Sequence, residues 1–327
     1  MNPNDLSYWN NSAKSNFSRR ELLQGGIAAS WGMLLSSVTP GDSAAAQTSH
    51  EKGWIDAHSH IWSRDIHRFP LVPGQTLDDL SPSSFTSEEL LDAAQPIGVT
   101  RVVLIQHDVY HAFDNTYLIH EARRFPETFR VVGKVDDTKP HPDRLMRQLF
   151  KQHVTSFRIT PRLGDNWLKG SGMVAMWKCA ADTRQAIGCL IDAEHLASVD
   201  AMCEQHPDTP VVIDHFARIG IDGNIREKDV NQLCRLARHP YTYVKLSAYY
   251  ALGAKKPPHD ELIPMIRRLF ETFGPQRLMW ASDAPYQLQG INNYADSLAL
   301  IRDRIHSLTD EDRVWLLRKT AENVYHF

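Results

Sequence analysis

Cysteine is scarce in this sequence of 327 residues, and no two cysteines form a Cys-x-x-Cys pair. The four thiols therefore do not indicate a zinc–thiolate or thioredoxin-like site, and we predict no disulfide bridge. Basic residues are not in excess, because 36 Lys and Arg face 39 Asp and Glu. This balance excludes the basic surface that nucleic-acid binding needs. No run reaches the roughly 20 apolar residues of a membrane span, so we expect no stable membrane anchor.

The first 46 residues have a composition of their own. A Ser-Arg-Arg-Glu-Leu-Leu motif at 18–23 resembles a twin-arginine export signal, and an apolar run follows at 25–35. Small residues at Ala44 and Ala46 suit signal peptidase. The order of these features predicts a signal peptide at 1–46, read by the twin-arginine export machinery, and a periplasmic mature domain at 47–327. The alternative is a disordered tail with an accidental arginine pair.

Beyond residue 53, short runs rich in β-branched residues alternate with helical patterns. The eight predicted strands lie at 54–56, 102–106, 130–135, 156–159, 187–191, 211–213, 243–246 and 278–280. Alternating strands and helices predict a parallel sheet. Eight such units favour an α/β (β/α)8 TIM barrel of the metal-dependent-hydrolase type over an open sheet. No Gly-x-Gly-x-x-Gly follows the first strand, which argues against a dinucleotide-binding fold.

In such barrels the chemistry lies where strands end. The first strand ends in His58-Ser59-His60. Residues two apart in an extended strand point to the same side. Both histidines can therefore face the barrel axis and hold one metal ion or one anionic substrate group. The alternative is a pair of histidines that bond only to backbone carbonyls.

Three later strands also end in reactive side chains. Asp283 follows the eighth strand, where a carboxylate can act as general base or bind a metal. His215 follows the sixth strand beside Asp214, and could polarise a carbonyl or ligate a metal. Arg158 ends the fourth strand and suits a substrate carboxylate, which arginine grips with two parallel hydrogen bonds. The alternatives are a capping aspartate, a core histidine and an outward ion pair.

Further candidates line the same predicted rim. Gln106 and Tyr110 follow the second strand and are our first choices there for contact with a substrate. Lys245 and Ser247 share one face of the seventh strand, and either could contact a ligand or pair with Asp214.

Together these segments resemble the amidohydrolase superfamily, within it the amidohydrolase-2 branch, and there most the 2-pyrone-4,6-dicarboxylate lactonases and sugar-lactone hydrolases. The resemblance runs from about residue 53 to the end. It rests on Ile-Asp-Ala-His-Ser-His at 55–60, Val-Leu-Ile-Gln at 103–106, Phe-Arg at 157–158, Val-Ile-Asp-His at 212–215, Val-Lys-Leu-Ser at 244–247 and Trp-Ala-Ser-Asp-Ala-Pro at 280–285.

The resemblance implies a role for each matching residue. Asp283 would be the general base, and the three histidines His58, His60 and His215 would surround the scissile carbonyl. Arg158 and Arg218 would hold a carboxylate. A metal ion, if bound, would take His58, His60 and Asp283 as ligands.

Two departures from the family pattern bear on the metal and the substrate. Metal-dependent decarboxylases of this branch carry a histidine at the end of the fifth strand, where this sequence has Asp192 and Glu194 and reaches His195 only later. This favours a lactonase without an obligatory metal. In addition, Ala-Ser-Asp-Ala-Pro stands where Gly-Thr-Asp-Trp-Pro is more usual, which changes one pocket wall.

Three functions remain in competition. The first is a hydrolase of a lactone or similar cyclic ester of a small carboxylated compound. The second is a decarboxylase or amide hydrolase that depends on a divalent metal, zinc or manganese. The third is a periplasmic binding or scaffolding protein on a degenerate barrel, against which the clustering of reactive residues at strand ends speaks.

Overall fold

A computed structural model of the chain describes residues 53–162 and 167–327. The proposed signal peptide at 1–46 lies outside these residues. Residues 53–327 form one compact unit. Within the described residues, no helix has the length and apolar character needed to cross a membrane.

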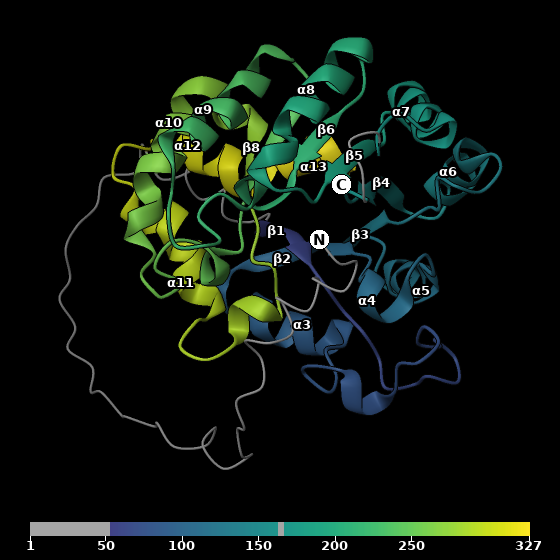
Figure 1. Cartoon of the computed structure of the whole chain (residues 1–327). Coiled ribbons are helices and arrows are strands. Elements are labelled where there is room, and N and C mark those ends of the chain that lie inside the picture. Colours follow the sequence, from purple (N-terminus) through teal and green to yellow (C-terminus); the bar gives the residue numbers. More distant parts are fainter. Residues whose placement is uncertain (1–52, 163–166) are drawn as a thin grey trace, which may run out of the picture. The chain divides into compact units, whose positions relative to one another are not determined.

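Eight parallel strands follow one another around a single sheet in chain order (Figure 1). The strands are β1 (Trp54–Ser59), β2 (Val99–Ile105), β3 (Phe129–Gly133), β4 (Val154–Ile159), β5 (Ala186–Cys189), β6 (Val211–Ile213), β7 (Thr242–Leu246) and β8 (Leu278–Trp280). The sheet nearly closes, because Ser59 at the end of β1 bridges in parallel to Ala284 beyond β8. Two hydrogen bonds reinforce this junction, from Asp283 N to His58 O at 2.9 Å and from His60 N to Ala284 O at 2.8 Å. The predicted (β/α)8 barrel is confirmed.

Helices follow the strands and surround the sheet (Figure 1). They are α3 (Ser87–Ala94), α4 (Asp108–His111), α5 (Thr116–Arg124), α6 (Pro142–Phe150), α7 (Ser171–Thr183), α8 (Leu196–Gln205), α9 (Glu227–Arg235), α10 (Ile263–Phe273), α11 (Tyr294–Ala299), α12 (Asp310–Val314) and α13 (Thr320–Tyr325). The predicted alternation of strands with helices is therefore present. The helices after β8 include π-helical segments, because Leu300–Arg304 continues α11 and Trp315–Lys319 joins α12 to α13.

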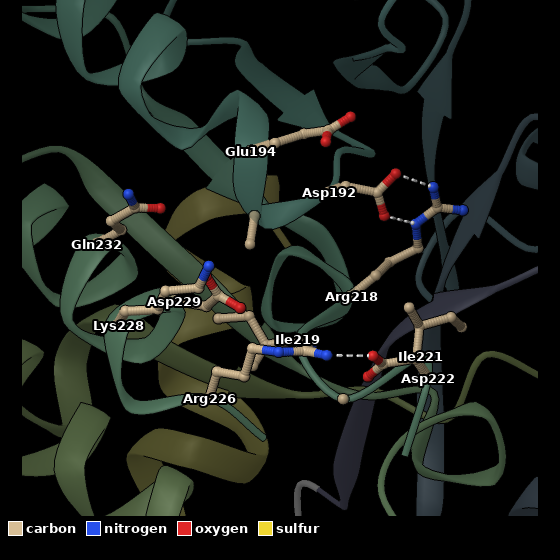
Figure 2. Close-up of a pocket in the computed structure, with 12 residues that line it drawn as sticks. Asp192, Glu194, Arg218, Ile219, Ile221, Asp222, Arg226, Lys228, Asp229 and Gln232 are labelled. Atoms are coloured by element: carbon tan, nitrogen blue, oxygen red, sulfur yellow. Dashed lines mark hydrogen bonds and ion pairs between the residues drawn. The ribbon is translucent and has the colours of Figure 1, made fainter. Parts of the chain in front are cut away.

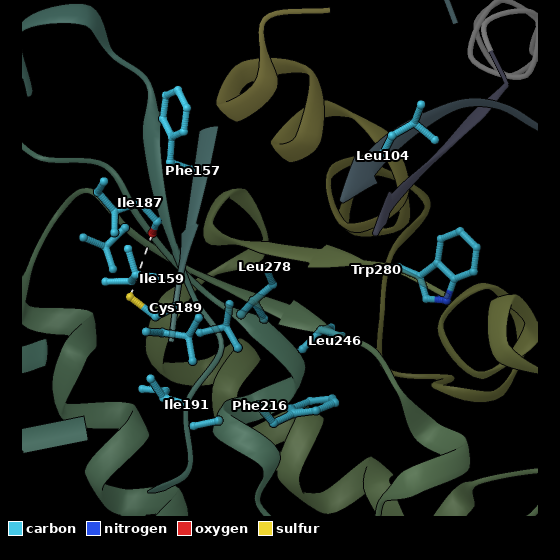
Figure 3. Close-up of a cluster of buried hydrophobic side chains, with 14 of the residues drawn as sticks. Leu104, Phe157, Ile159, Ile187, Cys189, Ile191, Phe216, Leu246, Leu278 and Trp280 are labelled. Atoms are coloured by element: carbon cyan, nitrogen blue, oxygen red, sulfur yellow. Dashed lines mark hydrogen bonds between the residues drawn. The ribbon is translucent and has the colours of Figure 1, made fainter. Parts of the chain in front are cut away.

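Strand alternation divides the apolar side chains into two cores. One side of each strand packs against the helices, as Phe157, Ile187, Leu246 and Trp280 do (Figure 3). The opposite side fills the barrel with the smaller cluster, which includes Ile55, Val103, Val132, Ala186, Val212 and Met279. Tyr325 of α13 joins this inner cluster. The barrel interior is therefore packed rather than open, and the polar inward-facing residues gather towards the carboxyl ends of the strands.

All four cysteines, Cys179, Cys189, Cys203 and Cys234, are buried free thiols. Burial raises the pKa of Cys189 well above its ordinary value. Because the thiolate is the reactive form, this thiol is poorly suited to nucleophilic chemistry.

Candidate active site

The end of β1 contains an irregularity that sets the direction of its histidines. Asp56 pairs with Val102 and Ser59 with Leu104, so three steps along β1 match two along β2. An extra residue of this kind is a β-bulge, which re-aims the side chains that follow it. Ile55 and Ala57 belong to the inner core. Strict alternation would therefore point His58 away from the axis, and the bulge allows His58 to turn inward.

His58 and His60 meet Asp283 at the mouth of the barrel. Three atoms, His58 Nε2, His60 Nε2 and Asp283 Oδ1, lie 3.4 Å from one another in each pairing. We call them the acceptor triangle. His60 Nδ1 lies 2.9 Å from the carbonyl oxygen of Ile105, to which it can only donate, so Nε2 of that ring carries a lone pair. All three side chains are buried, so the triangle can hold one small species such as a water molecule or a metal ion.

Asp283 is held so that its two oxygens have different partners. Tyr250 donates its hydroxyl to Oδ2 at 2.8 Å, while Oδ1 faces the two histidines. The residue adopts a left-handed backbone conformation, with φ of 66°. Burial raises the pKa of the Asp283 carboxyl, although His215 and the Tyr250 hydrogen bond oppose the rise. A raised pKa makes this carboxylate a better proton acceptor.

His215 reaches the same place from β6 by an unusual turn. Residues 215–218 all have φ near +50°, a conformation that L-residues seldom adopt in succession. The turn places the ring of His215 4.4 Å from that of His58, and Nδ1 of His215 lies 2.8 Å from Ser247 Oγ. Backbone strain of this kind concentrates at functional sites, where the surrounding packing holds it in place.

A buried charge cluster of Arg158, Asp214 and Lys245 lies beneath the histidines. Asp214 forms two ion pairs, one through each carboxylate oxygen. Arg158 Nη2 lies 3.2 Å from Oδ2, and Lys245 Nζ lies 3.1 Å from Oδ1. Arg158 Nη2 also lies 2.6 Å from His58 Nε2. Arginine only donates, so Nε2 of His58 accepts that bond and His58 is neutral. Burial alone would raise the pKa of Asp214, but Lys245 and Arg158 hold it well below its usual range.

The three site histidines share a shift in one direction. Burial lowers the pKa of His60 to about 3 and that of His215 to about 4. Burial and the nearby Lys245 lower the pKa of His58 well below its ordinary value. The rings are therefore neutral near pH 7, and each can offer one lone pair and one N–H.

Arg218 does not join this group. It forms two hydrogen bonds with Asp192, from Nε at 2.7 Å and from Nη2 at 2.6 Å (Figure 2). Both residues line a cavity of about 460 Å³ on the side of β5 and β6, next to α9. Among the described residues that line it, none belongs to the acceptor triangle. In this structure Arg218 is committed to Asp192 and is not aimed at the triangle.

Gln106 and Tyr110 occupy different layers around the site. Gln106 is fully buried at the end of β2, where its amide nitrogen donates to Ala112 O at 3.3 Å. The Tyr110 hydroxyl accepts from Ser81 N at 3.0 Å, and its ring stacks on His107 at 4.6 Å. His107 in turn contacts the ring of His60 at 4.8 Å. Tyr110 therefore supports the wall of the site from behind, and its hydroxyl is already used by the backbone.

Residues 55–327 match the amidohydrolase family. The chain belongs to the amidohydrolase family.

Two curated relatives of this chain are named as lactone hydrolases. The L-fucono-1,5-lactonase of Burkholderia ambifaria is 30% identical over 71% of this chain and 80% of its own length. The 4-sulfomuconolactone hydrolase of Rhizobium radiobacter is 24% identical over 72% of this chain and 76% of its own length. The protein is accordingly a hydrolase of this family.

Two solved structures share the fold. A probable 2-pyrone-4,6-dicarboxylic acid hydrolase from Acinetobacter baumannii, with citric acid bound, superposes with a TM-score of 0.70. The two sequences are 17% identical, and the match covers 84% of this chain and 100% of the Acinetobacter chain. An amidohydrolase from Burkholderia multivorans with bound zinc gives a TM-score of 0.68 and 19% identity over 84% and 99% of the two chains.

The site of this amidohydrolase contains a donor set that fits a metal ion. His58, His215 and Asp283 offer ligand atoms that lie within 4.8 Å of one another. The acceptor triangle is tighter, and ligand atoms about 2.0–2.1 Å from a tetrahedral zinc ion lie about 3.4 Å apart. The predicted ligands His58, His60 and Asp283 therefore have suitable spacing, although Arg158 competes for one of them.

Tyr250 and Tyr286 are parts of the site that sequence reasoning missed. Tyr250 lies in a short 3-10 helix, Tyr249–Ala251, which begins after a left-handed residue, Ala248. Strand alternation cannot predict where a side chain points once the backbone has left the strand at such a residue. Tyr286 makes a short hydrogen bond with His107 Nε2. The feature of the sequence that could have indicated Tyr286 is its position three residues after Asp283.

Proposed function

We propose that this amidohydrolase hydrolyses a lactone or similar cyclic ester of a small carboxylated compound, with Asp283 as general base. The observation that carries the proposal is the acceptor triangle, because a buried carboxylate oxygen there faces two neutral histidines. Such a site can take a proton from a bound water molecule. The two curated lactone hydrolases support the choice of substrate class.

The reaction follows from this geometry in two steps. Asp283 Oδ1 removes a proton from water, and the resulting hydroxide attacks the lactone carbonyl carbon. The tetrahedral intermediate then collapses with cleavage of the ring C–O bond, and protonated Asp283 returns its proton to the departing alkoxide. One water is added across one ester bond, and Asp283 ends the cycle ionised.

Arg158 and His215 are the donors that we assign to the developing oxyanion. Both are buried beside His58, and Arg158 Nε has no hydrogen-bond partner among the described residues. A preorganised donor at an oxyanion commonly contributes about 3–4 kcal/mol to transition-state stabilisation. Arg158 also fits the carboxylate of the proposed substrate, since its free N–H can bond to one oxygen.

A divalent metal ion, when bound, would be held by His58, His60 and Asp283, and would supply Lewis-acid polarisation of a bound oxygen. We propose that the hydrolysis does not require it. The support comes from Arg158, whose guanidinium already bonds to one of the three ligand atoms.

A lactone screen before and after chelation tests this function. The protein is dialysed against a chelator, its metal content is measured, and hydrolysis of fuconolactone, a muconolactone and 2-pyrone-4,6-dicarboxylate is followed by proton release. We expect turnover of at least one lactone, with less than a twofold change on chelation. Binding of these compounds without turnover would refute the proposed function. Loss of activity on chelation, restored by zinc or manganese, would refute the metal-free mechanism alone.

A metal-dependent decarboxylase or amide hydrolase is the second candidate, favoured by the spacing of the acceptor triangle. The same metal measurement separates the two. One equivalent of metal in the purified protein, with release of carbon dioxide or an amine and no lactone turnover, would establish the second candidate.

We also propose export to the periplasm by the twin-arginine route, with cleavage after Ala46. The motif at 18–23, the apolar run and the small residues at the cleavage site support it. Replacing both arginines (Arg19→Lys, Arg20→Lys) should retain the full-length chain in the cytoplasm, whereas the unchanged chain should appear in the periplasmic fraction, shortened by 46 residues. Equal distribution of the two chains would contradict the proposal.

A further inference from the structure

The acceptor triangle holds three lone-pair atoms with no proton of their own to share. His60 Nε2 is unprotonated because Nδ1 of the same ring donates to Ile105 O, and Asp283 Oδ1 is a carboxylate oxygen. His58 Nε2 is unprotonated because it accepts from Arg158. Three such atoms 3.4 Å apart repel one another unless a cation or a donor lies among them. The triangle by itself therefore attracts a divalent ion.

Arg158 supplies that positive charge from one side. Its Nη2 lies 2.6 Å from His58 Nε2, a charge-assisted hydrogen bond that occupies the lone pair an ion would need. One lone pair cannot serve the guanidinium and an ion at the same time, so the two compete for His58 Nε2.

The charges around the site oppose an additional cation as well. Arg158 and Lys245 are both buried, with exposed fractions of 4% and 1%, and they balance the carboxylates of Asp214 and Asp283. Asp214 keeps Arg158 in place through a hydrogen bond of 3.2 Å. A divalent ion at the triangle would meet a guanidinium bonded to its own ligand, with little water to screen the repulsion.

We propose that Arg158 is the residue that keeps this site free of a tightly bound divalent ion, by holding the His58 Nε2 lone pair. Arg158 thus determines whether the three ligands His58, His60 and Asp283 stay free of metal or bind an ion. This inference rests on the metal-free form of the proposed function, but its test measures metal binding and not turnover, so the two can fail separately.

The test compares the wild-type protein with Arg158→Met and Arg158→Lys after chelation. Zn²⁺ alone is titrated by calorimetry, and Co²⁺ alone is followed by its visible absorption, which reports tetrahedral coordination. We expect Arg158→Met to bind Zn²⁺ roughly 10- to 100-fold more tightly than wild type, the factor that loss of one competing charged hydrogen bond gives. Arg158→Lys keeps a buried cation and should remain weak.

Two control variants locate the effect. Arg162→Met makes the same change beyond the same strand, at a side chain that is 44% exposed and pairs with Asp137, and should bind Zn²⁺ as wild type does. The double variant Arg158→Met/His58→Asn should lose the gain. If it keeps the gain, the ion is bound elsewhere, for example at Asp192, Glu194 and His195, and the proposal is wrong.

Two other results would overturn the proposal. One is equal Zn²⁺ affinity in Arg158→Met and wild type, with circular dichroism showing that the variant is folded. The other needs no variant, since retention of one equivalent of zinc by the wild-type protein, after dialysis against micromolar free zinc, would show that Arg158 does not exclude the ion. If Arg158→Met does not fold, Arg158→Gln and the wild-type measurement decide the question.

Discussion

Replacing Asp283 with asparagine should lower kcat/KM for lactone hydrolysis by roughly 10²- to 10⁴-fold, the usual contribution of a positioned general base. Asparagine keeps the size of the side chain and can still accept the Tyr250 hydroxyl that bonds to Oδ2 in the native site. It cannot remove a proton from water. The expected loss is therefore in kcat, with KM changed much less.

Steady-state kinetics on the lactone that the screen identifies would measure this loss. Asp208→Asn makes the same chemical change at an exposed turn and should leave kcat/KM unaltered. Tyr250→Phe should have a smaller effect of about 10-fold on kcat, because the carboxylate stays but loses the bond that orients it. An Asp283→Asn enzyme with more than a tenth of wild-type kcat would show that another group activates the water.

The wild-type pH profile should agree with the same assignment. Burial raises the pKa of Asp283 above its ordinary value of 3.8, so the active carboxylate form is lost, as pH falls, sooner than an exposed aspartate would lose it. kcat/KM should therefore decline on the acidic side with an apparent pKa above 3.8. The site histidines have lowered pKa values and should add no limb between pH 6 and 8.

Much of the fold could be predicted because each barrel strand is a short apolar run and is followed by polar residues that mark its carboxyl end. Val211–Ile213 and Leu278–Trp280 match the predicted bounds, since a short apolar run between polar residues leaves little choice of register. The strand-end rule then located Asp283, His215 and Arg158 together without any knowledge of distances. Lys245 is found paired with Asp214, as one predicted alternative had it.

The remainder depended on backbone features that leave no pattern in the sequence. The bulge in β1 turns His58 towards the barrel axis, whereas alternation from Ile55 and Ala57 would have turned it outward. His58 therefore faces the axis because of the bulge and not because of the strand alternation from which we predicted it. The left-handed turn at 215–218 carries Arg218 to Asp192. Non-glycine residues rarely adopt this conformation in succession, so no propensity scale anticipates it.

Asp214→Asn is expected to lower the free energy of unfolding by about 3–5 kcal/mol, the usual result of removing one partner from a buried ion pair. Arg158 and Lys245 would both lose their shared carboxylate, and two buried cations would remain beside His58. The native state stabilises the ionised form of Asp214, whose pKa lies well below its ordinary value. That contribution is fully present above the pKa of an unfolded aspartate, about 3.9, and is lost as the pH falls further.

Urea unfolding at pH 7 of three variants would test this account. The double variant Asp214→Asn/Lys245→Met removes one of the two unpaired cations and should recover part of the lost stability. Asp283→Asn should behave in the opposite way to Asp214→Asn, because the native state disfavours the charged form of Asp283, and a neutral amide there should leave stability unchanged or raise it. The two buried aspartates would then have different roles, because the negative charge of Asp214 stabilises the fold whereas that of Asp283 serves the reaction. Equal destabilisation by both substitutions would contradict that division.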